Sequence, residues 1–417
     1  MSVARRPYLN RIADAELDLL TDELPGVMLV GPRGCGKTTS ASRRAASEAR
    51  LDVPSVAEAF RANPDAAIRG NTLPLLIDEW QLVPEALGAV KRAIDSGTQP
   101  GSFLVTGSIR SAVDGEHWPG TGRLTRVTIL PFTEREKRGL GSKQGFLERA
   151  ASGTASEPTP STLEIDDYIE LALAGGYPEA AGLGSPEASR RWYASYVSDT
   201  INRDVRGLSG SATRARDPQR LRTWLEAIAI NSAGTPTAAS LCRAAGLNNR
   251  TADAYDGLLE DLFVTERLPA WNTNRLKRLT RTPKRYLIDT GVWGAALGVD
   301  AVSLKLEGNL TGRLLDTFVA AQLRPEVEAT SGRMYHLRTA DNRREIDLLI
   351  ELPGGGMVAI EVQASAGPGP DSAKHIEWLR DQIGDDLIAG FVLHSGTRTY
   401  ELGERIVAAP IASLWAD

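Results

Sequence analysis

The feature that most constrains this chain is the stretch Gly31-Pro32-Arg33-Gly34-Cys35-Gly36-Lys37-Thr38-Thr39. It fits the P-loop (Walker A) pattern G-x-x-x-x-G-K-[ST], and it follows an apolar run at residues 27–30. A loop of small residues between a buried strand and a helix can turn its backbone N–H groups around a polyphosphate. Lys37 then reaches the β- and γ-phosphates, and the Thr38 hydroxyl ligates Mg²⁺. The pattern therefore predicts a site for ATP and Mg²⁺.

A second motif supports this interpretation. The run Leu75-Leu76-Ile77-Asp78-Glu79 reads as a buried parallel strand with carboxylates at its C-terminal end. In nucleoside triphosphatases, Asp78 would hold Mg²⁺ directly or through water, and Glu79 would polarise the attacking water. Together the two motifs predict a catalytic site for ATP hydrolysis.

A third apolar run, at residues 103–105, is followed by Thr106-Gly107-Ser108. A polar residue at the tip of a neighbouring strand can sense the γ-phosphate or position the water. Thr106 and Ser108 both qualify, and the sequence does not choose between them. A turn formed by the Gly/Ser cluster explains the same residues.

ATPases often place an arginine against the γ-phosphate, either in the same subunit or from a neighbour. Arg123 is the first candidate, and Arg110 and Arg126 are its rivals. Whether this arginine acts within its own subunit is not decided by the sequence.

Composition adds limits to these interpretations. The formal net charge is −5, so any nucleic-acid contact must come from a local basic patch. Two distant cysteines, Cys35 and Cys242, fit a reducing cytoplasm better than a disulfide framework. No apolar run approaches the ~20 residues that a membrane helix needs. We therefore expect a cytoplasmic protein without a membrane segment, and an oligomer is compatible with the sequence.

The chain of 417 residues divides into five predicted segments. Residues 1–140 alternate apolar strands with amphipathic segments, as a doubly wound α/β domain does. Residues 141–162 are rich in Gly, Ser, Thr and Pro and predict a loop or linker. Residues 163–210 predict a helical lid, residues 211–300 a winged helix, and residues 301–417 an α/β domain.

The winged-helix prediction rests on three helical patterns between residues 218 and 262, followed by strand signals at residues 263–264 and 286–288. The third helix carries several acidic residues, which phosphates would repel. Basic residues gather instead in the segment that we call the wing cluster: Arg275, Lys277, Arg278, Arg281, Lys284 and Arg285. This cluster is compatible with DNA contact, with a protein partner, or with a merely solvated hairpin.

In the C-terminal segment, Asp347 and Glu361 lie on two strand patterns separated by the turn 353–356. Adjacent strands would bring these carboxylates together, and Asp316 on the preceding helix could reach the same pocket. Such carboxylates can bind Mg²⁺ for phosphodiester cleavage. Gln363 stands where the pattern D…(D/E)-x-K expects a lysine, and a neutral amide stabilises phosphate charge poorly. Cleavage and non-cleaving scaffolding both remain open.

Taken together, these motifs resemble a large group of uncharacterised bacterial and archaeal AAA+ ATPases with a C-terminal domain of unknown function. The matching features are Tyr8-Leu9-Asn10-Arg11, residues 31–39, Ile77-Asp78-Glu79, residues 104–108, Gly122-Arg123, Leu130-Pro131-Phe132, residues 175–179, Asn202-Arg203-Asp204, residues 286–291, residues 312–316, Glu345-Ile346-Asp347, Glu361-Val362, Pro410-Ile411 and Leu414-Trp415.

The resemblance implies an AAA+ core, a helical extension, a winged-helix segment and a C-terminal domain similar to the PD-(D/E)XK nuclease fold. It also implies that Tyr8 and Arg11 line the adenine side. Asp316 and Gln363 depart from the expected glutamate and lysine. We expect a Mg²⁺-dependent ATPase coupled to C-terminal modules. The alternative is a nucleotide-gated switch with slow turnover that binds DNA or protein and carries an inactive nuclease-like domain.

Overall fold

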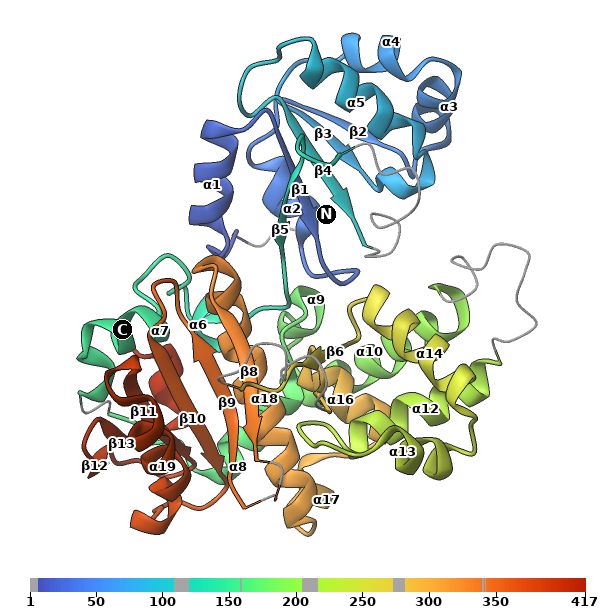
Figure 1. Ribbon diagram of the computed structural model, residues 1–417. Coiled ribbons are helices and arrows are strands. Elements are labelled where there is room, and N and C mark those ends of the chain that lie inside the picture. Colours follow the sequence, from blue (N-terminus) through green and yellow to red (C-terminus); the bar gives the residue numbers. More distant parts are fainter. Residues whose placement is uncertain are drawn as a thin grey trace. The chain divides into compact units, whose positions relative to one another are not determined.

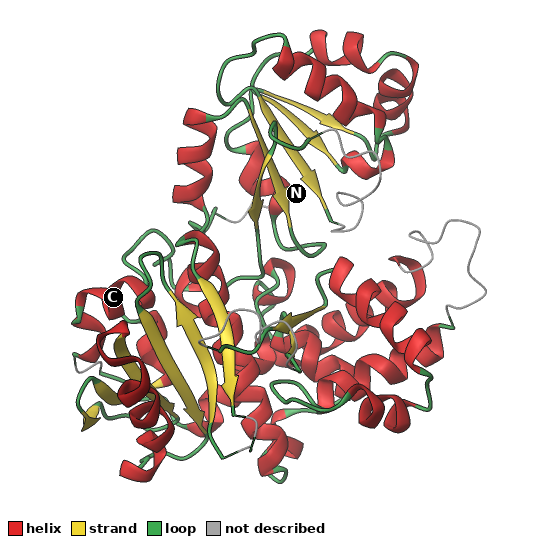
Figure 2. Cartoon of the chain, viewed as in Figure 1, coloured by secondary structure: helices red, strands yellow, loops and turns green. Residues whose placement is uncertain are grey.

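The structure is a computed structural model of the 417-residue chain. It describes residues 7–108, 120–157, 160–204, 217–272, 282–339, 341 and 343–417. The chain forms two compact units (Figures 1 and 2). The P-loop unit comprises Asn10–Pro131 with Glu260–Phe263, and the large unit comprises Met1–Leu9, Phe132–Leu259 and Val264–Asp417.

The P-loop unit contains a five-stranded parallel sheet with the order β2-β3-β4-β1-β5. Its strands are β1 (Gly26–Val30), β2 (Ser47–Arg50), β3 (Leu75–Asp78), β4 (Phe103–Gly107) and β5 (Thr125–Thr128). Val27, Leu29, Leu76 and Leu104 are fully buried in its core. The central strands are apolar up to their C-terminal ends, as in a sheet whose two faces are covered by helices. This confirms the expected parallel α/β core.

Helices flank that sheet: α1 (Asp14–Glu23), α2 (Lys37–Ser42), α3 (Pro54–Ala62), α4 (Pro64–Arg69), α5 (Glu85–Asp95) and the 3-10 turn η1 (Trp80–Leu82). Both α3 and α4 begin with proline, whose missing N–H costs nothing at a first helical position. The Asn63 side chain accepts a hydrogen bond from Ala66 N and so caps α4. These signals end one helix and start the next within two residues.

The large unit is mostly helical before its C-terminal sheet. Its helices are α6 (Glu134–Lys137), α7 (Phe146–Ser152), α8 (Ile165–Ala174), α9 (Pro178–Ala181), α10 (Pro186–Asp199), α12 (Pro218–Ile230), α13 (Ala238–Ala245), α14 (Asn249–Asp261), α16 (Thr290–Leu297), α17 (Ala301–Leu304), α18 (Gly308–Ala329) and α19 (Lys374–Ile383), with short turns η3 (Thr154–Ser156), η4 (Thr200–Asp204), η5 (Pro370–Ala373), η6 (Gly384–Asp386) and η7 (Ile411–Trp415).

The expectation of a loop throughout residues 141–162 is wrong. Residues 146–152 form α7, which buries Phe146 and Leu147. The Phe146 ring packs against Phe391 of the C-terminal sheet, with ring centroids 4.9 Å apart. The flanking glycines and serines masked a short amphipathic helix, since tertiary burial outweighs local propensity.

Three helices lie where the winged-helix prediction places them, namely α12, α13 and α14. A two-stranded antiparallel hairpin follows, made of β6 (Thr265–Leu268) and β7 (Lys284–Leu287). The observed strands therefore begin about two residues away from the predicted runs at residues 263–264 and 286–288. Arg275, Lys277, Arg278 and Arg281 of the wing cluster lie outside the described residues.

The C-terminal sheet has six strands in the order β12-β13-β11-β10-β9-β8. They are β8 (Arg333–Arg338), β9 (Glu345–Glu351), β10 (Met357–Gln363), β11 (Leu387–His394), β12 (Tyr400–Gly403) and β13 (Ile406–Pro410). Strands β8, β9 and β10 pair antiparallel, and β10 pairs parallel with β11 across α19. Helix α18 precedes the sheet in sequence and packs on β8, β9 and β10. Asp347 and Glu361 therefore lie on neighbouring strands, as the sequence predicts.

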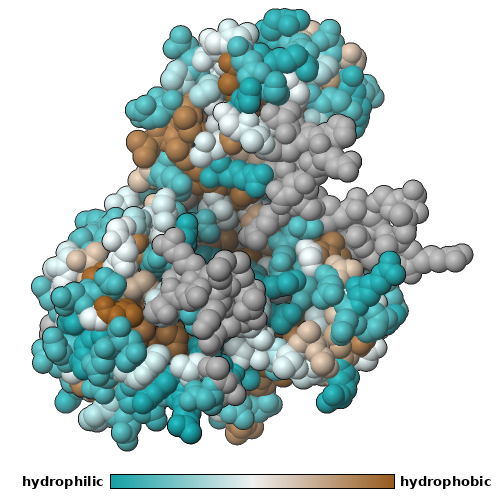
Figure 3. Space-filling view, in the orientation of Figure 1, coloured by the Kyte–Doolittle hydropathy of each residue, from teal (hydrophilic) through white to brown (hydrophobic). Residues whose placement is uncertain are grey.

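The visible surface is mainly hydrophilic, with apolar side chains in scattered patches (Figure 3). Across the described ranges, the longest and most apolar helices fall short of what a membrane crossing requires.

Candidate nucleotide-binding site

The P-loop joins β1 to α2 through a backbone that glycine permits. Gly31, Gly34 and Gly36 adopt φ values of +145°, +81° and +99°, which side chains rarely tolerate. A Cβ atom on Gly31 would lie 2.0 Å from the carbonyl oxygen of Ile129. Both the torsion angle and the close approach therefore require glycine at position 31. The conformation of the P-loop thus depends on this residue.

Lys37 lies at the start of α2 and folds back over this loop. Its side chain is buried, and Nζ lies 3.0 Å from Gly31 O and 2.8 Å from Pro32 O. A lysine ammonium is a point charge on a flexible stem and can exchange carbonyl partners for phosphate oxygens. The ammonium is thus held against the backbone of the P-loop.

Asp78 ends β3 at the same edge of the sheet. Its Oδ1 accepts hydrogen bonds from Thr38 Oγ1 at 2.9 Å and from Thr106 Oγ1. Strand β4 lies between β3 and β1, and because all three are parallel, their carboxyl ends meet at one edge. The structure therefore brings together Thr38, Asp78 and Thr106, three residues that the sequence analysis assigned to one site.

These residues fit the chemistry of Mg²⁺. A hydroxyl and a carboxylate oxygen are hard ligands, and Mg²⁺ in nucleotide sites usually takes one or two such groups along with phosphates and waters. The hydrogen bond between Thr38 and Asp78 places both donors within reach of one ion. In the described part of the chain, no group of three His, Cys, Asp or Glu residues could hold a metal ion by itself.

Glu79 follows Asp78 with φ +56°, a conformation unusual for a residue other than glycine. Its carboxylate accepts a hydrogen bond from the Gln81 side-chain amide. Backbone strain of this kind is often kept at functional sites because the surrounding fold fixes it. Glu79 is thus positioned by Gln81 directly after the strand that carries Asp78.

Of the two polar candidates after β4, Thr106 is the one bonded to Asp78. Ser108 is 7% exposed, and its Oγ has no hydrogen-bond partner among the described residues. Such a buried hydroxyl is costly unless another group completes its hydrogen bonding. Both residues therefore remain candidates, with different surroundings.

Arg123 is not placed for a role at its own P-loop. Its Nε donates to Asp95 Oδ1 at 2.9 Å on α5, and a Cβ added to Gly26 would lie 3.2 Å from the Arg123 carbonyl oxygen. The Arg123 backbone therefore lies near the start of β1, whereas the P-loop follows the end of β1. The two ends of this strand are about 13 Å apart. This position does not favour a role at its own P-loop, a question that the sequence left open, and a role in a neighbouring subunit stays a prediction; Arg110 lies outside the described residues.

Arg11 clamps the back of the P-loop. Its guanidinium is 4% exposed and donates to the carbonyl oxygens of Cys35 and Leu130. Cys35 Sγ lies 3.0 Å from the Ile129 carbonyl oxygen. Arg11 thus joins the P-loop at Cys35 to Leu130, and its expected place beside adenine stays a prediction.

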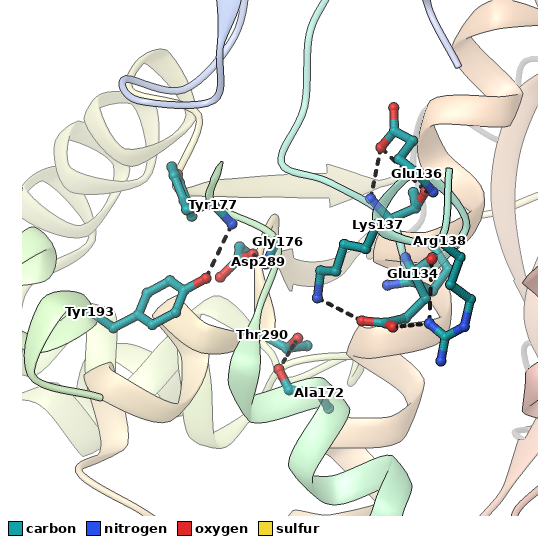
Figure 4. Close-up of polar contacts among 12 residues, drawn as sticks. Glu134, Glu136, Lys137, Arg138, Ala172, Gly176, Tyr177, Tyr193, Asp289 and Thr290 are labelled. Atoms are coloured by element: carbon teal, nitrogen blue, oxygen red, sulfur yellow. Dashed lines mark hydrogen bonds and ion pairs between the residues drawn. The ribbon is translucent and has the colours of Figure 1, made fainter. Parts of the chain in front are cut away.

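The chain then enters the large unit through a buried network (Figure 4). Phe132 N donates to Gly176 O at 2.6 Å, and Gly176 N donates to Asp289 Oδ2 at 2.6 Å. Tyr193 accepts from Tyr177 N at 3.2 Å, and burial raises the pKa of the Asp289 carboxyl. Three motifs that are far apart in sequence therefore meet where the polypeptide leaves the P-loop unit.

A second cluster of charges lies in the large unit. Lys284 is fully buried, and its Nζ lies 2.9 Å from Asp347 Oδ1 and 3.4 Å from Glu345 Oε1. Asp347 Oδ2 also accepts from Val362 N at 3.1 Å. Asp316 and Asp347 line a cavity of about 620 Å³, together with Arg313 and Arg338. The sequence did not indicate Lys284 as a member of this cluster.

Two residues of the wing cluster are therefore misassigned. Lys284 pairs with Asp347, and Arg285, 9% exposed, pairs with Asp256 at 2.8 Å. Both belong to β7, where the apolar run 286–288 continues the strand. The sequence alone does not distinguish a basic residue in a buried strand from one in an exposed wing. The fold does so, because it shows the acidic partners of Lys284 and Arg285.

The electrostatics follow from burial and crowding. Burial, reinforced by the charge of Asp347, raises the pKa of the Asp316 and Glu361 carboxyls well above their usual values. For Asp347 burial acts in the same direction, but Lys284 outweighs it and lowers its pKa. For Lys284 burial alone would lower the pKa, yet Asp347 raises it well above the usual value. Lys284 and Asp347 thus form a buried ion pair.

Gln363 is hydrogen-bonded to two serine side chains. Its Oε1 accepts hydrogen bonds from Ser372 Oγ at 3.1 Å and Ser365 Oγ at 3.3 Å. Asp316, Asp347 and Glu361 do not form a ligand set either, since no metal-holding group of three occurs in the described ranges. The expected metal site of the C-terminal domain is therefore not formed by these residues.

Comparison with known proteins gives three matches along the chain. Residues 25–137 match the family of AAA domains, residues 165–303 match a domain of unknown function (DUF8612), and residues 311–414 match another (DUF4143). The AAA match spans the P-loop and all five strands of the parallel sheet.

Two similar relatives are uncharacterised proteins of Mycobacterium tuberculosis (strain ATCC 25618 / H37Rv) and Mycobacterium bovis (strain ATCC BAA-935 / AF2122/97). Each is 28% identical over 406 residues, which cover 96% of this chain and 83% of the relative. Among solved structures, AMPPCP-bound DnaA from Aquifex aeolicus is 13% identical, with a TM-score of 0.26 over 60% of this chain and 86% of that one. That score is too low to bear on fold or function.

Proposed function

We propose that the P-loop unit binds ATP with Mg²⁺, hydrolyses it, and passes its nucleotide state to the large unit. The observation that carries the proposal is the junction of Thr38, Asp78 and Thr106 beside the P-loop. The AAA match over residues 25–137 supports the same activity. Nucleotide binding and ATPase chemistry need a phosphate cradle and a metal-ligating carboxylate at one sheet edge.

Each residue then has a role. Residues 31–39 hold the phosphates by backbone N–H groups, and Lys37 moves from Gly31 O and Pro32 O to phosphate oxygens. Mg²⁺, when bound, neutralises charge on the β- and γ-phosphates. Thr38 and Asp78 orient toward that position, and Glu79 takes the proton of the attacking water. Thr106 or Ser108 senses the γ-phosphate.

The test is the metal dependence of ATP affinity. Measure ATP binding by calorimetry, with Mg²⁺ and with EDTA, for the native chain and for Asp78→Asn. We expect EDTA to raise the Kd of the native chain by about tenfold or more, which corresponds to about 1.4 kcal/mol. In Asp78→Asn the metal effect should shrink, because an amide is a weaker ligand. An equal Kd with and without Mg²⁺ in the native chain would contradict the proposed site.

We also propose that the segment from α18 to β11 is similar in fold to restriction-type nucleases. The order helix, three antiparallel strands, helix and parallel strand supports this kinship, with Asp347 on the second strand and Glu361 on the third. Because the carboxylates do not form a ligand set, we propose a binding or scaffolding role for this module rather than cleavage.

DNA contact through the wing cluster is a second candidate function. The four basic residues Arg275, Lys277, Arg278 and Arg281 occur with no acidic residue among them. Measure duplex-DNA affinity against salt for the native chain, for Arg278→Gln/Arg281→Gln, and for Arg191→Gln as an exposed control on α10. The double variant should make the log–log slope shallower by about one unit per lost phosphate contact. If the native chain does not bind at low salt, this candidate is withdrawn.

A further inference from the structure

The buried Lys284 lies where the C-terminal carboxylates would otherwise meet a cation. Its side chain is 1% exposed and comes from β7, outside the sheet that carries Asp347 and Glu361. The Nζ–Oδ1 distance of 2.9 Å to Asp347 is that of a charge-assisted hydrogen bond. The ammonium has a second carboxylate neighbour in Glu345, at 3.4 Å.

One carboxylate of this cluster, that of Glu361, is incompletely hydrogen-bonded. Glu361 Oε1 is buried and has no hydrogen-bond partner among the described residues, although His375 Nδ1 lies 3.6 Å away. Asp316 shares the cavity with Asp347. Asp316, Asp347 and Glu361 crowd around one ammonium, and the only other cationic side chains lining the described cavity are Arg313 and Arg338. The donor chemistry suits a divalent cation, but the position beside Asp347 is already taken by Lys284.

We propose that Lys284 is a built-in counter-ion that replaces a divalent cation among Asp316, Asp347 and Glu361, and that removing its ammonium opens a divalent-cation site there. A divalent ion in contact with Asp347 would lie close to the ammonium, and unscreened like charges repel strongly in a buried site. The cavity of about 620 Å³ is lined by Asp316 and Asp347 and gives a small hydrated ion access to these two carboxylates once the ammonium of Lys284 is removed.

The surroundings of Lys284 support a permanent rather than an exchangeable charge. His336 is buried near it, and burial together with the charge of Lys284 lowers the pKa of His336 to about 3. A neutral imidazole adds no competing positive charge near neutral pH. The strongest electrostatic partner of the ammonium is therefore Asp347, which already lies within hydrogen-bond distance.

The test is Mn²⁺ binding by the full-length, nucleotide-free chain, followed by electron paramagnetic resonance of free Mn²⁺. Every protein carries Asp78→Asn, so that the P-loop metal ligand is removed throughout. Three variants are made in this background and compared with it: Lys284→Met, Lys284→Arg and the double variant Lys284→Met/Glu361→Gln. We expect Lys284→Met to gain one Mn²⁺ bound at least about tenfold more tightly than by the background. Lys284→Arg keeps the charge and should gain none.

The double variant Lys284→Met/Glu361→Gln should lose the gained ion, which would assign it to this cluster. A folded Lys284→Met protein that gains no Mn²⁺ would refute the proposal. If Lys284→Met does not fold, Mn²⁺ binding is compared between the Asp78→Asn background and the same protein with Glu361→Gln added. A Mn²⁺ ion bound by the background and lost with Glu361→Gln overturns the counter-ion assignment, and equal stoichiometry supports it. Neither result depends on ATP binding.

Discussion

Glu79→Gln will bind ATP with nearly native affinity but hydrolyse it about 100-fold more slowly or worse, because general-base catalysis contributes that order of rate. The glutamine keeps the shape of the side chain and can hydrogen-bond water, but it cannot accept the proton. The strained backbone at Glu79 and its contact with Gln81 should both survive this isosteric change. Steady-state phosphate release and calorimetric ATP binding measure the two effects separately.

Lys37→Ala is the matched comparison. Loss of the ammonium removes the charge held at the mouth of the cradle, so ATP binding itself should be abolished in the calorimeter. The pair of variants separates binding from chemistry at neighbouring parts of one site. Unchanged ATP affinity in Lys37→Ala would show that the P-loop is not the nucleotide site, and native turnover in Glu79→Gln would remove Glu79 as the base.

Asp347→Asn will lower the free energy of unfolding of the large unit by about 3–5 kcal/mol, the usual cost of leaving one partner of a buried ion pair without the other. Lys284 is 1% exposed, and when Asp347 becomes neutral the remaining ion-pair partner of its ammonium is the partly exposed Glu345, at 3.4 Å. The amide also loses charge-assisted hydrogen bonding to Val362 N. Chemical denaturation followed by tryptophan fluorescence measures the change, since six of the eight tryptophans belong to the large unit.

Asp166→Asn provides the control in the same unit. Asp166 pairs with Lys305 at 2.6 Å, but the two side chains are 57% and 45% exposed. Exposed pairs of this kind contribute about 1 kcal/mol or less. If Asp347→Asn costs no more than Asp166→Asn, the buried pair does not stabilise the fold as described.

The sequence predicts much of the nucleotide site, because its signals are local. A glycine loop between a strand and a helix, and a carboxylate at a strand end, have a fixed geometric meaning in a parallel sheet. The sequence therefore places Thr38 and Asp78 at one edge, while it leaves the choice between Thr106 and Ser108 open. The placement of Asp347 next to Glu361 was predicted for the same reason, since a short turn joins two adjacent strands.

Other predictions failed where the environment of a residue depends on a partner that is distant in the sequence. Lys284 and Arg285 looked like part of an exposed basic hairpin until Asp347 and Asp256 were seen to bury them. Arg123 was a candidate because ATPases often place an arginine against the γ-phosphate, but it precedes β5 and lies near the start of β1, whereas the P-loop follows the end of β1. Helix α7 was hidden by flanking glycines and serines. Burial and strand order, which composition does not encode, settled these cases.

A single residue, Pro131, separates Leu130, whose carbonyl Arg11 holds, from Phe132, whose N–H binds Gly176. The pyrrolidine ring fixes one of the few torsions available there. Backbone rotation between these two hydrogen-bonded positions is therefore confined to the remaining torsions of residues 130–132.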